Sequence, residues 1–123
     1  MKPAIFEHER MSSIDDVVQA LANADGEVRV LGGGQSIGPM MNLRLAQPDK
    51  VLDLSRVEGL DGISEAGGRL SIGARVTHAR IEDGEVPGTT GAYMQFVASG
   101  ISYRSVRNRG TIGGSVAHAD PAA

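Results

Sequence analysis

The chain has 123 residues and a formal net charge of −3, with 12 Lys plus Arg against 15 Asp plus Glu, no cysteine, two Phe and two Tyr. This composition excludes disulfides, cysteine ligation of zinc or iron–sulfur clusters and a cysteine nucleophile, and it gives neither the basic surface nor the stacking side chains of a nucleic-acid-binding protein. No apolar run approaches the roughly 18 residues of a membrane span, so we expect no membrane span and a cytoplasmic location.

The first half of the chain alternates strand and helix patterns. Ser13 is a candidate helix N-cap with Asp16 three positions later, and apolar residues follow at helical spacing. Pro39 suits the first turn of a second, short helix. The expected elements are a short edge strand at residues 3–6, a helix between Ser13 and Asn23, a strand at 28–31, a short helix at 39–45 and a strand at 51–54.

Beyond Arg56 the pattern changes, because glycines interrupt short apolar stretches such as residues 70–72, which predicts a hairpin-rich second lobe. Residues 89–99 are predicted to form a helix that ends at Gly100. The glycines that mark the change are Gly59, Gly62, Gly67 and Gly68, and the predicted helix carries Ala92, Phe96 and Ser99 on one side. We therefore place a boundary within residues 55–59 and divide the chain into 1–56 and 57–123.

Two glycine-rich segments are candidates for the halves of one anion-binding cradle. Glycine exposes bare amide N–H donors and reaches positive φ at little cost, so a phosphate group can approach its backbone closely. Hydroxyl and amide side chains in both segments add further donors. The candidate residues are Gly32, Gly33, Gly34, Gln35 and Ser36 in the first segment, and Thr111, Ile112, Gly113, Gly114 and Ser115 in the second.

The first segment fits neither of two common phosphate-binding motifs. A G-x-G-x-x-G pattern that starts at Gly32 fails because Ile37 stands in its last position. Started at Gly33, the pattern fails because Gln35 stands in its middle. The P-loop pattern lacks its lysine, since Pro39 stands there. A neutral cradle remains, suited to a diphosphate that is held and not cleaved, while spacing alone supports tight turns or close strand contacts equally well.

Other conspicuous residues have structural explanations. His118 and Asp120 form an H-x-D pair, which predicts no metal site without a third ligand. His78 is expected to cap a helix or to pack, and Met40 and Met41 are expected to pack beneath the first segment. Three arginines precede the second segment, and for them phosphate contact, subunit contact and solvation stay open; they are Arg104, Arg107 and Arg109.

Longer stretches around both segments closely resemble the FAD-binding medium subunit of the molybdenum hydroxylases, a family that includes aerobic carbon monoxide dehydrogenases and xanthine dehydrogenase-like enzymes. The stretches are residues 32–36 continuing through 39–45, residues 106–115 and residues 117–123. The resemblance runs from Lys2 to the last residue, and family members continue past this point. We therefore expect the chain to be an N-terminal fragment.

The resemblance implies an α+β fold, the vanillyl-alcohol-oxidase (PCMH) type of FAD-binding domain, with two subdomains of which the second is truncated. Residues 1–56 would form the N-terminal subdomain, and 57–123 would begin the second. In such subunits the loop matching Gly32–Ser36 holds the FAD diphosphate, and the loop matching Thr111–Ser115 closes over it. The position matching Ile101 lies near the flavin.

The same resemblance implies a flavoprotein oxidoreductase subunit in an electron relay. Substrate would be hydroxylated on a large molybdopterin subunit, electrons would pass through 2Fe-2S clusters on a small subunit, and FAD on this chain would deliver them to an external acceptor. The expected assembly is a dimer of heterotrimers. We assign no catalytic residue and no metal site to this chain. The alternative is a non-catalytic assembly module that keeps the fold without retaining FAD.

Overall fold

The computed structural model describes residues 1–122 and divides the chain into two compact units, one from Met1 to Glu58 and one that begins at Gly59. Each unit buries an apolar cluster of its own. The division lies close to the boundary expected after residue 56. Whether the two units act as the expected FAD-binding subdomains stays a prediction.

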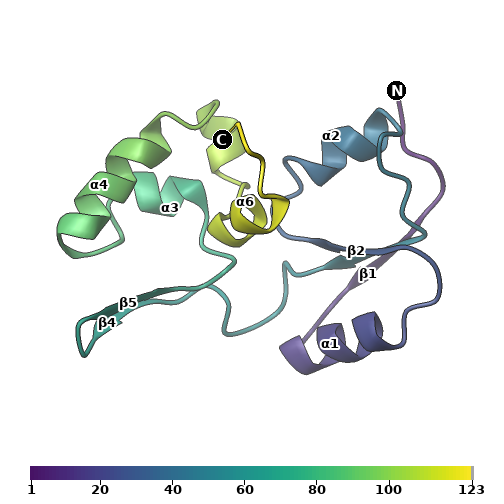
Figure 1. The fold of residues 1–123 in the computed structure, drawn as a ribbon, viewed down its shortest axis with the longest axis horizontal. Coiled ribbons are helices and arrows are strands. Elements are labelled where there is room, and N and C mark those ends of the chain that lie inside the picture. The colour runs from purple at the N-terminus through teal and green to yellow at the C-terminus, as the bar shows by residue number, and fades with distance from the viewer. Residues whose placement is uncertain (123) are drawn as a thin grey trace. The chain divides into compact units, whose positions relative to one another are not determined.

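The first unit is built on a parallel three-stranded sheet (Figure 1). Strands β1 (Glu7–Arg10), β2 (Val28–Leu31) and β3 (Lys50–Asp53) lie in the order β1-β3-β2. Helix α1 (Ile14–Ala22) follows β1, and helix α2 (Ile37–Asn42) connects β2 to β3. Because the strands are parallel, the segment that follows β2 lies at the carboxyl edge of the sheet, where α/β proteins commonly bind ligands.

Local signals predict these elements well, except for β1. Ser13 caps α1 as expected, because its side chain accepts a hydrogen bond from the amide of Asp16 at 3.1 Å. Strands β2 and β3 and the short helix α2 form within about one to three residues of the expected bounds. Pro39 lies in the first turn of α2, where its missing N–H is tolerated.

The edge strand predicted at residues 3–6 is wrong, because pairing begins at Glu7. The amide of Glu7 donates to the carbonyl of Asp49, and the register pairs Glu7 with Lys50. Lys50 Nζ lies 3.2 Å from Glu7 and 3.1 Å from Glu9, on the neighbouring strand. Opposite charges across a strand pair favour this register, whereas Ile5 before it is fully exposed.

Strand β3 is the centre of the first core because it is paired on both sides. Its residues Val51 and Leu52 are 1% and 0% exposed, although successive side chains point to opposite faces of a strand. Met41 is buried next to Val51, and Met40 packs against the same cluster, as the sequence predicts. Both methionines belong to α2, the helix that follows the first glycine segment, and they anchor this helix to the first core.

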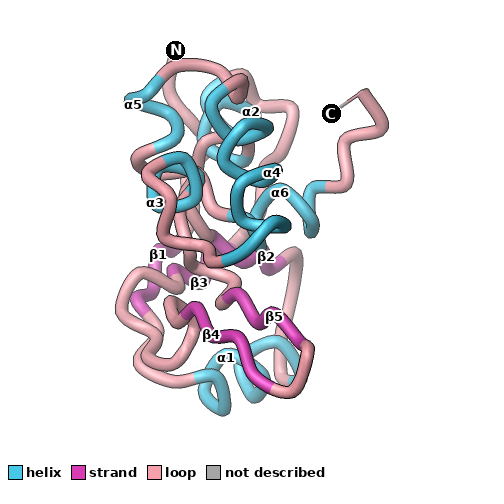
Figure 2. Tube along the Cα trace, turned by 90° about the vertical axis from the view of Figure 1, so that its left-hand side faces the viewer, coloured by secondary structure: helices cyan, strands magenta, loops and turns pink. Residues whose placement is uncertain are grey.

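The second unit joins a β-hairpin to several short helices (Figures 1 and 2). Strands β4 (Ile63–Ala66) and β5 (Arg69–Ile72) are antiparallel. Gly67 and Gly68 connect them with φ of 58° and 73°, as a two-residue hairpin turn requires. The helices are α3 (His78–Glu82), α4 (Gly88–Ser99), α5 (Arg104–Arg107) and α6 (Ile112–His118). The sequence predicts the hairpin and α4 but not α3, α5 or α6, which are too short to show a helical period.

Helix α4 is buried on a different side from the one that its sequence marks. Gly91 and Ala98 face the core, which contains Val76, Ile81 and Val86. A Cβ on Gly91 would collide with the carbonyl of Val86, so glycine allows the helix to approach. The side marked from the sequence faces solvent, with Ala92, Phe96 and Ser99 all exposed.

Candidate functional site

The segment Gly32–Ser36 joins the end of β2 to the first turn of α2. Gly34 has a φ of +74°, which favours glycine, and a Cβ there would lie 3.3 Å from the side chain of Leu31. Gly32 to Gln35 are half-buried and Ser36 is exposed. The backbone of this segment is therefore accessible at the carboxyl edge of the sheet.

The backbone amides of this segment have no hydrogen-bond acceptor among the described residues. Within residues 1–122, no amide N–H from Gly32 to Ser36 donates a hydrogen bond. The side-chain amide of Gln35 donates to the carbonyl of Gly33 at 3.2 Å, and the Ser36 hydroxyl makes no cap bond to α2. Consecutive free amides form a neutral site that an anion can enter, because each oxygen can accept several of them. The segment thus fits a diphosphate.

The second predicted segment is not a loop but the beginning of helix α6. Thr111 is its N-cap, and its hydroxyl accepts a hydrogen bond from the amide of Gly114 at 3.0 Å. Residues 112–115 form the first turn, and the amide of Ser115 donates to the carbonyl of Thr111. The expectation of a glycine loop at Thr111–Ser115 is therefore corrected. Thr111 caps a helix whose first turn is formed by residues 112–115.

The amide donors of this turn are already used within the unit. The amide of Ile112 donates to the carbonyl of Val76, and that of Gly113 donates to the carbonyl of Ala74, both at 3.0 Å. A Cβ on Gly113 would lie 2.6 Å from both the Cβ and the carbonyl oxygen of Ala74. Glycine is needed at this position because two pieces of backbone meet, whether or not a ligand approaches.

His78 fastens the same turn from helix α3. Its ring Nε2 lies 2.9 Å from the hydroxyl of Ser115, and its backbone amide donates to the carbonyl of Gly110 at 2.9 Å. Thr77 and Thr111 form an isolated antiparallel bridge beside it. The residue is 6% exposed, and burial lowers the pKa of His78, so the ring is neutral near pH 7. As expected, His78 is a packing residue.

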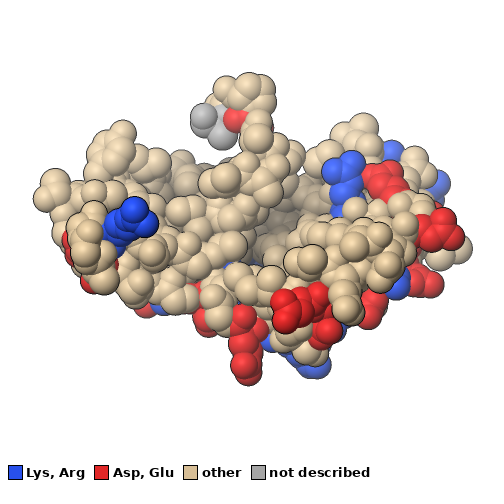
Figure 3. Space-filling view, turned by 60° about the horizontal axis from the view of Figure 1, so that its bottom comes forward, with Lys and Arg blue, Asp and Glu red and all other residues tan. Residues whose placement is uncertain are grey.

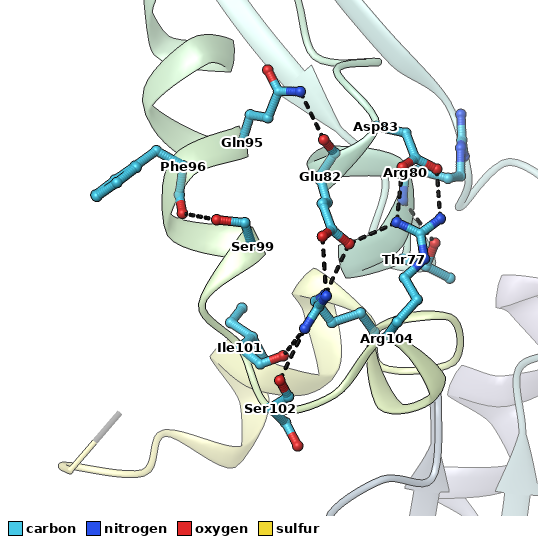
Figure 4. Close-up of polar contacts among 11 residues, drawn as sticks. Thr77, Arg80, Glu82, Asp83, Gln95, Phe96, Ser99, Ile101, Ser102 and Arg104 are labelled. Atoms are coloured by element: carbon cyan, nitrogen blue, oxygen red, sulfur yellow. Dashed lines mark hydrogen bonds and ion pairs between the residues drawn. The ribbon is translucent and has the colours of Figure 1, made fainter.

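Arg107 connects α3 to the turn that follows α4, and Figure 4 labels its partners Glu82, Ile101 and Ser102. The Nε and Nη2 atoms of Arg107 lie 2.8 Å and 3.0 Å from the two carboxylate oxygens of Glu82. Its Nη1 donates to the carbonyls of Ile101 and Ser102, at 2.8 Å and 2.9 Å. Hydrogen bonds from Arg107 and then Arg104 lower the pKa of the Glu82 carboxyl, which keeps it charged at neutral pH.

Arg104 belongs to the same network but does not reach that turn. Its guanidinium lies 2.6 Å from Glu82 and forms two hydrogen bonds to Asp83, at 2.8 Å and 2.7 Å. Arg104 and Arg107 both pair with carboxylates of their own unit, and for them too phosphate contact, subunit contact and solvation stay open. Arg109 is exposed and its side chain has no partner in the described part of the chain, so its use stays open.

Sequence reasoning misses two pairs that organise the second unit. The Glu82–Arg107 pair joins residues 25 positions apart, and the His78–Ser115 pair joins residues 37 positions apart. Both depend on α3, a five-residue helix. The only local signal is Thr77, whose side chain caps α3 by accepting from the amide of Arg80.

One face of the molecule carries charges of both signs. On the face shown in Figure 3, Lys and Arg side chains lie among Asp and Glu side chains without forming a broad basic area. Within residues 1–122, no group of three or more His, Asp or Glu side chains could hold a metal ion. In the same residues, no helix combines the length and the apolar character that crossing a membrane requires.

Comparisons with known proteins agree on one group of enzymes. Residues 4–123 match the family described as the FAD binding domain in molybdopterin dehydrogenase. The whole chain is 35% identical to the 6-hydroxypseudooxynicotine dehydrogenase complex subunit alpha of Paenarthrobacter nicotinovorans. Over 98% of its length it is 36% identical to the carbon monoxide dehydrogenase medium chain of Hydrogenophaga pseudoflava. It spans 42% of the length of each relative.

Solved structures give the same result. The fold matches quinoline 2-oxidoreductase from Pseudomonas putida 86 with a TM-score of 0.89 and 39% identity, over 100% of this chain and 43% of that one. It matches carbon monoxide dehydrogenase from Hydrogenophaga pseudoflava with a TM-score of 0.89 and 35% identity, over 98% of this chain and 42% of that one. Sequence and fold therefore point to the same relatives.

Proposed function

This chain belongs to the family of FAD-binding domains of molybdopterin dehydrogenases, and we propose that it holds FAD in such an enzyme and relays electrons through it. The family and the α+β fold of the vanillyl-alcohol-oxidase (PCMH) type expected from the sequence are confirmed by the matches. The chain spans about two fifths of its relatives' length. The activity, substrate and partners of the complete enzyme are therefore part of the proposal.

The observation that carries this proposal is the run of backbone amides in Gly32–Ser36 that have no acceptor within the described part of the chain. FAD carries one diphosphate, whose negative oxygens need several donors when they leave water. The free backbone amides of Gly32 to Ser36, with the Ser36 hydroxyl, offer these donors without a positive side chain. Such a neutral site suits a diphosphate that is held while chemistry takes place elsewhere on the cofactor.

We further propose that the second segment and Ile101 border the same cofactor, in a different manner. The amides of Ile112, Gly113 and Gly114 are used internally, and Thr111 is buried. Gly114 and Ser115 are exposed, so this turn offers FAD a surface without Cβ bulk and one hydroxyl held by His78. In this proposal the second segment contributes shape to FAD binding, whereas the first contributes hydrogen bonds.

When bound, FAD supplies the redox chemistry, accepting electrons and releasing them to an acceptor. The residues of this chain bind it and orient it. No proton-transfer role is proposed, because His78 is buried, neutral and bonded to Ser115. The carboxylates of Glu82 and Asp83 are occupied by arginines.

The proposed partners follow from the family. Relatives are named as a medium subunit, a medium chain or a lettered subunit of a dehydrogenase complex. Because this chain has no cysteine, the 2Fe-2S clusters that feed FAD are proposed on a small partner subunit, and substrate hydroxylation on a large molybdopterin subunit. The dimer of heterotrimers and the cytoplasmic location stay predictions. The identity of the substrate stays open.

Titration of the purified chain with FAD tests the proposal, followed by flavin fluorescence and by thermal stability. We expect equimolar binding, and we expect ADP to compete better than FMN because ADP carries the diphosphate that the first segment receives. A chain that neither binds FAD nor gains stability from it contradicts the proposal. That result would favour the non-catalytic assembly module.

A further inference from the structure

We propose that Arg107 is a positioning residue for the flavin. Its ion pair with Glu82 fixes the Ile101–Ser102 turn in one conformation, and this preformed turn contacts the ring system of FAD. The inference rests on the proposed FAD binding, because it concerns how this chain holds the same cofactor.

The first observation is a strained backbone. Ser102 has a φ of +46°, in the left-handed region where a residue with a Cβ costs roughly 1 kcal/mol. Among residues 1–122, the other non-glycine residues with positive φ are Arg44 and Ala119. Such strain persists where the surroundings determine the conformation more strongly than the backbone does, and it concentrates at ligand-binding sites.

The second observation is the set of contacts that keeps Ser102 in this strained conformation. One edge of the Arg107 guanidinium faces the carboxylate of Glu82, and Nη1 donates to both carbonyls of the turn at 2.8 Å and 2.9 Å. The side chains of Arg107 and Glu82 are only 11% and 20% exposed. Shielding from water strengthens such a pair relative to a surface pair. The planar guanidinium of Arg107 is thus held between the Glu82 carboxylate and the Ile101–Ser102 turn.

The third observation is what the turn displays. Ile101 is half-buried, and the exposed Tyr103 follows the strained Ser102, with 78% of its surface accessible. Figure 4 shows Ile101 and Ser102 side by side at the end of α4, next to the arginine network. A rigid backbone that presents an aliphatic and an aromatic side chain suits a flat, conjugated ring, which gains from apolar contact and stacking.

Arg104 provides a matched control within the same network. It bonds Glu82 and Asp83 but makes no contact with either carbonyl of the turn. Replacing Arg107 leaves Glu82 paired with Arg104, so no shielded charge is left alone. The substitutions Arg107→Gln and Arg104→Gln therefore differ chiefly in whether the turn is released.

The experiment compares these two variants in the full chain, with FAD as the probe. Without FAD, we measure hydrogen exchange at the amide of Ile101, which donates to Ala98; R107Q should accelerate it and R104Q should not. With saturating FAD, R107Q should shift the visible absorption band of the bound flavin and weaken affinity about tenfold. Ile101→Ala should shift the band in the same direction, and R104Q should leave it unchanged.

Two further variants separate positioning from simple destabilisation. Arg107→Lys keeps the charge but loses the fork, so its band shift should fall between those of wild type and R107Q. Adding Ser102→Gly to R107Q should restore affinity in part, because glycine adopts positive φ without the clamp. Circular dichroism and thermal melting report whether each variant is folded.

The experiment distinguishes failure of this inference from failure of the proposed function. If R107Q and R107K bind FAD with the affinity and spectrum of wild type, the inference is overturned even if exchange at Ile101 becomes faster. If the wild-type chain itself binds no FAD, the proposed function fails and the inference fails with it. The two failures are distinguished by which protein, wild type or variant, departs from expectation.

Discussion

The two glycine-rich segments look alike in sequence and differ in what their backbones do. In Gly32–Ser36 no backbone amide donates a hydrogen bond within the described residues, and Gly34 takes a positive φ. In Thr111–Ser115 the amides after the cap are bonded to Ala74, Val76 and the cap itself. The first segment is open to an anion, whereas the second is closed by its own unit.

This difference teaches that a glycine cluster has two physical uses. Glycine can expose donors to a ligand, or it can let two backbones meet where a Cβ has no room. Sequence spacing does not separate the two uses. The hydrogen-bond partners of the amides do separate them, because an amide that is bonded inside the protein is not available to a ligand, whereas one without a protein acceptor can donate to water or to a ligand.

The largest expected effect is on Gly113. Gly113→Val places branched carbon atoms against the Cβ and carbonyl of Ala74, where a Cβ alone would already lie 2.6 Å away. We expect the free energy of unfolding of the second unit to fall by about 3 kcal/mol, measured by chemical denaturation. Any loss of FAD binding would then follow from loss of structure.

Gly38→Ala is the matched control, because a Cβ there meets nothing within 4 Å and the site lies in helix α2. It should leave the protein as stable or stabilise it by up to about 1 kcal/mol. Wild-type stability in Gly113→Val would show that the first turn of α6 is not seated on Ala74.

Gly33→Val tests the open segment. A branched side chain where the diphosphate approaches should weaken FAD binding by at least about tenfold, roughly 1.4 kcal/mol, while the free energy of unfolding stays close to that of wild type. Equilibrium dialysis with FAD and a denaturation curve measure the two quantities. Binding at wild-type affinity would remove this segment from the proposed site.

Substitutions at the two helix N-cap positions, Thr111 and Ser36, should change stability by a smaller amount and should differ from each other. Thr111→Ala removes a hydroxyl that caps α6, so it should cost about 1 kcal/mol of stability. Ser36→Ala removes a hydroxyl that caps nothing, so stability should not change. Thermal melting of both variants checks the contrast. Equal losses would mean that Ser36 is bonded inside the protein and is not available to FAD.

The smallest expected effect concerns pH. Burial lowers the pKa of His78 below its ordinary value of 6.5, so below that pH the unfolded chain binds a proton that the folded chain does not. Stability contributed by neutral His78 should be complete above pH 6.5 and decline as pH falls below it. His78→Gln should remove this component from a series of melting curves, and an unchanged series would show that His78 does not titrate as its burial implies.

How far the sequence predicts the molecule depends on the range of the interactions involved. The Ser13 cap of α1 and the Gly67–Gly68 turn are decided within a few residues, and both can be read from the sequence. Helix α3 and the Glu82–Arg107 pair cannot be read from the sequence, because the residues that stabilise them lie far away along the chain. The buried side of α4 is also missed, since the close approach of Gly91 to Val86 selects it.

The sequence by itself determined the family, the first glycine segment at the end of a strand, and the exclusion of cysteine-based chemistry. Only the tertiary structure decided which amides are free. The acceptors for residues 112 and 113 lie in the segment 74–76, and folding brings the two together. Hydrogen-bond satisfaction belongs to pairs of residues in space, whereas a motif describes residues in a row. For that reason two similar motifs became one candidate anion site and one structural junction.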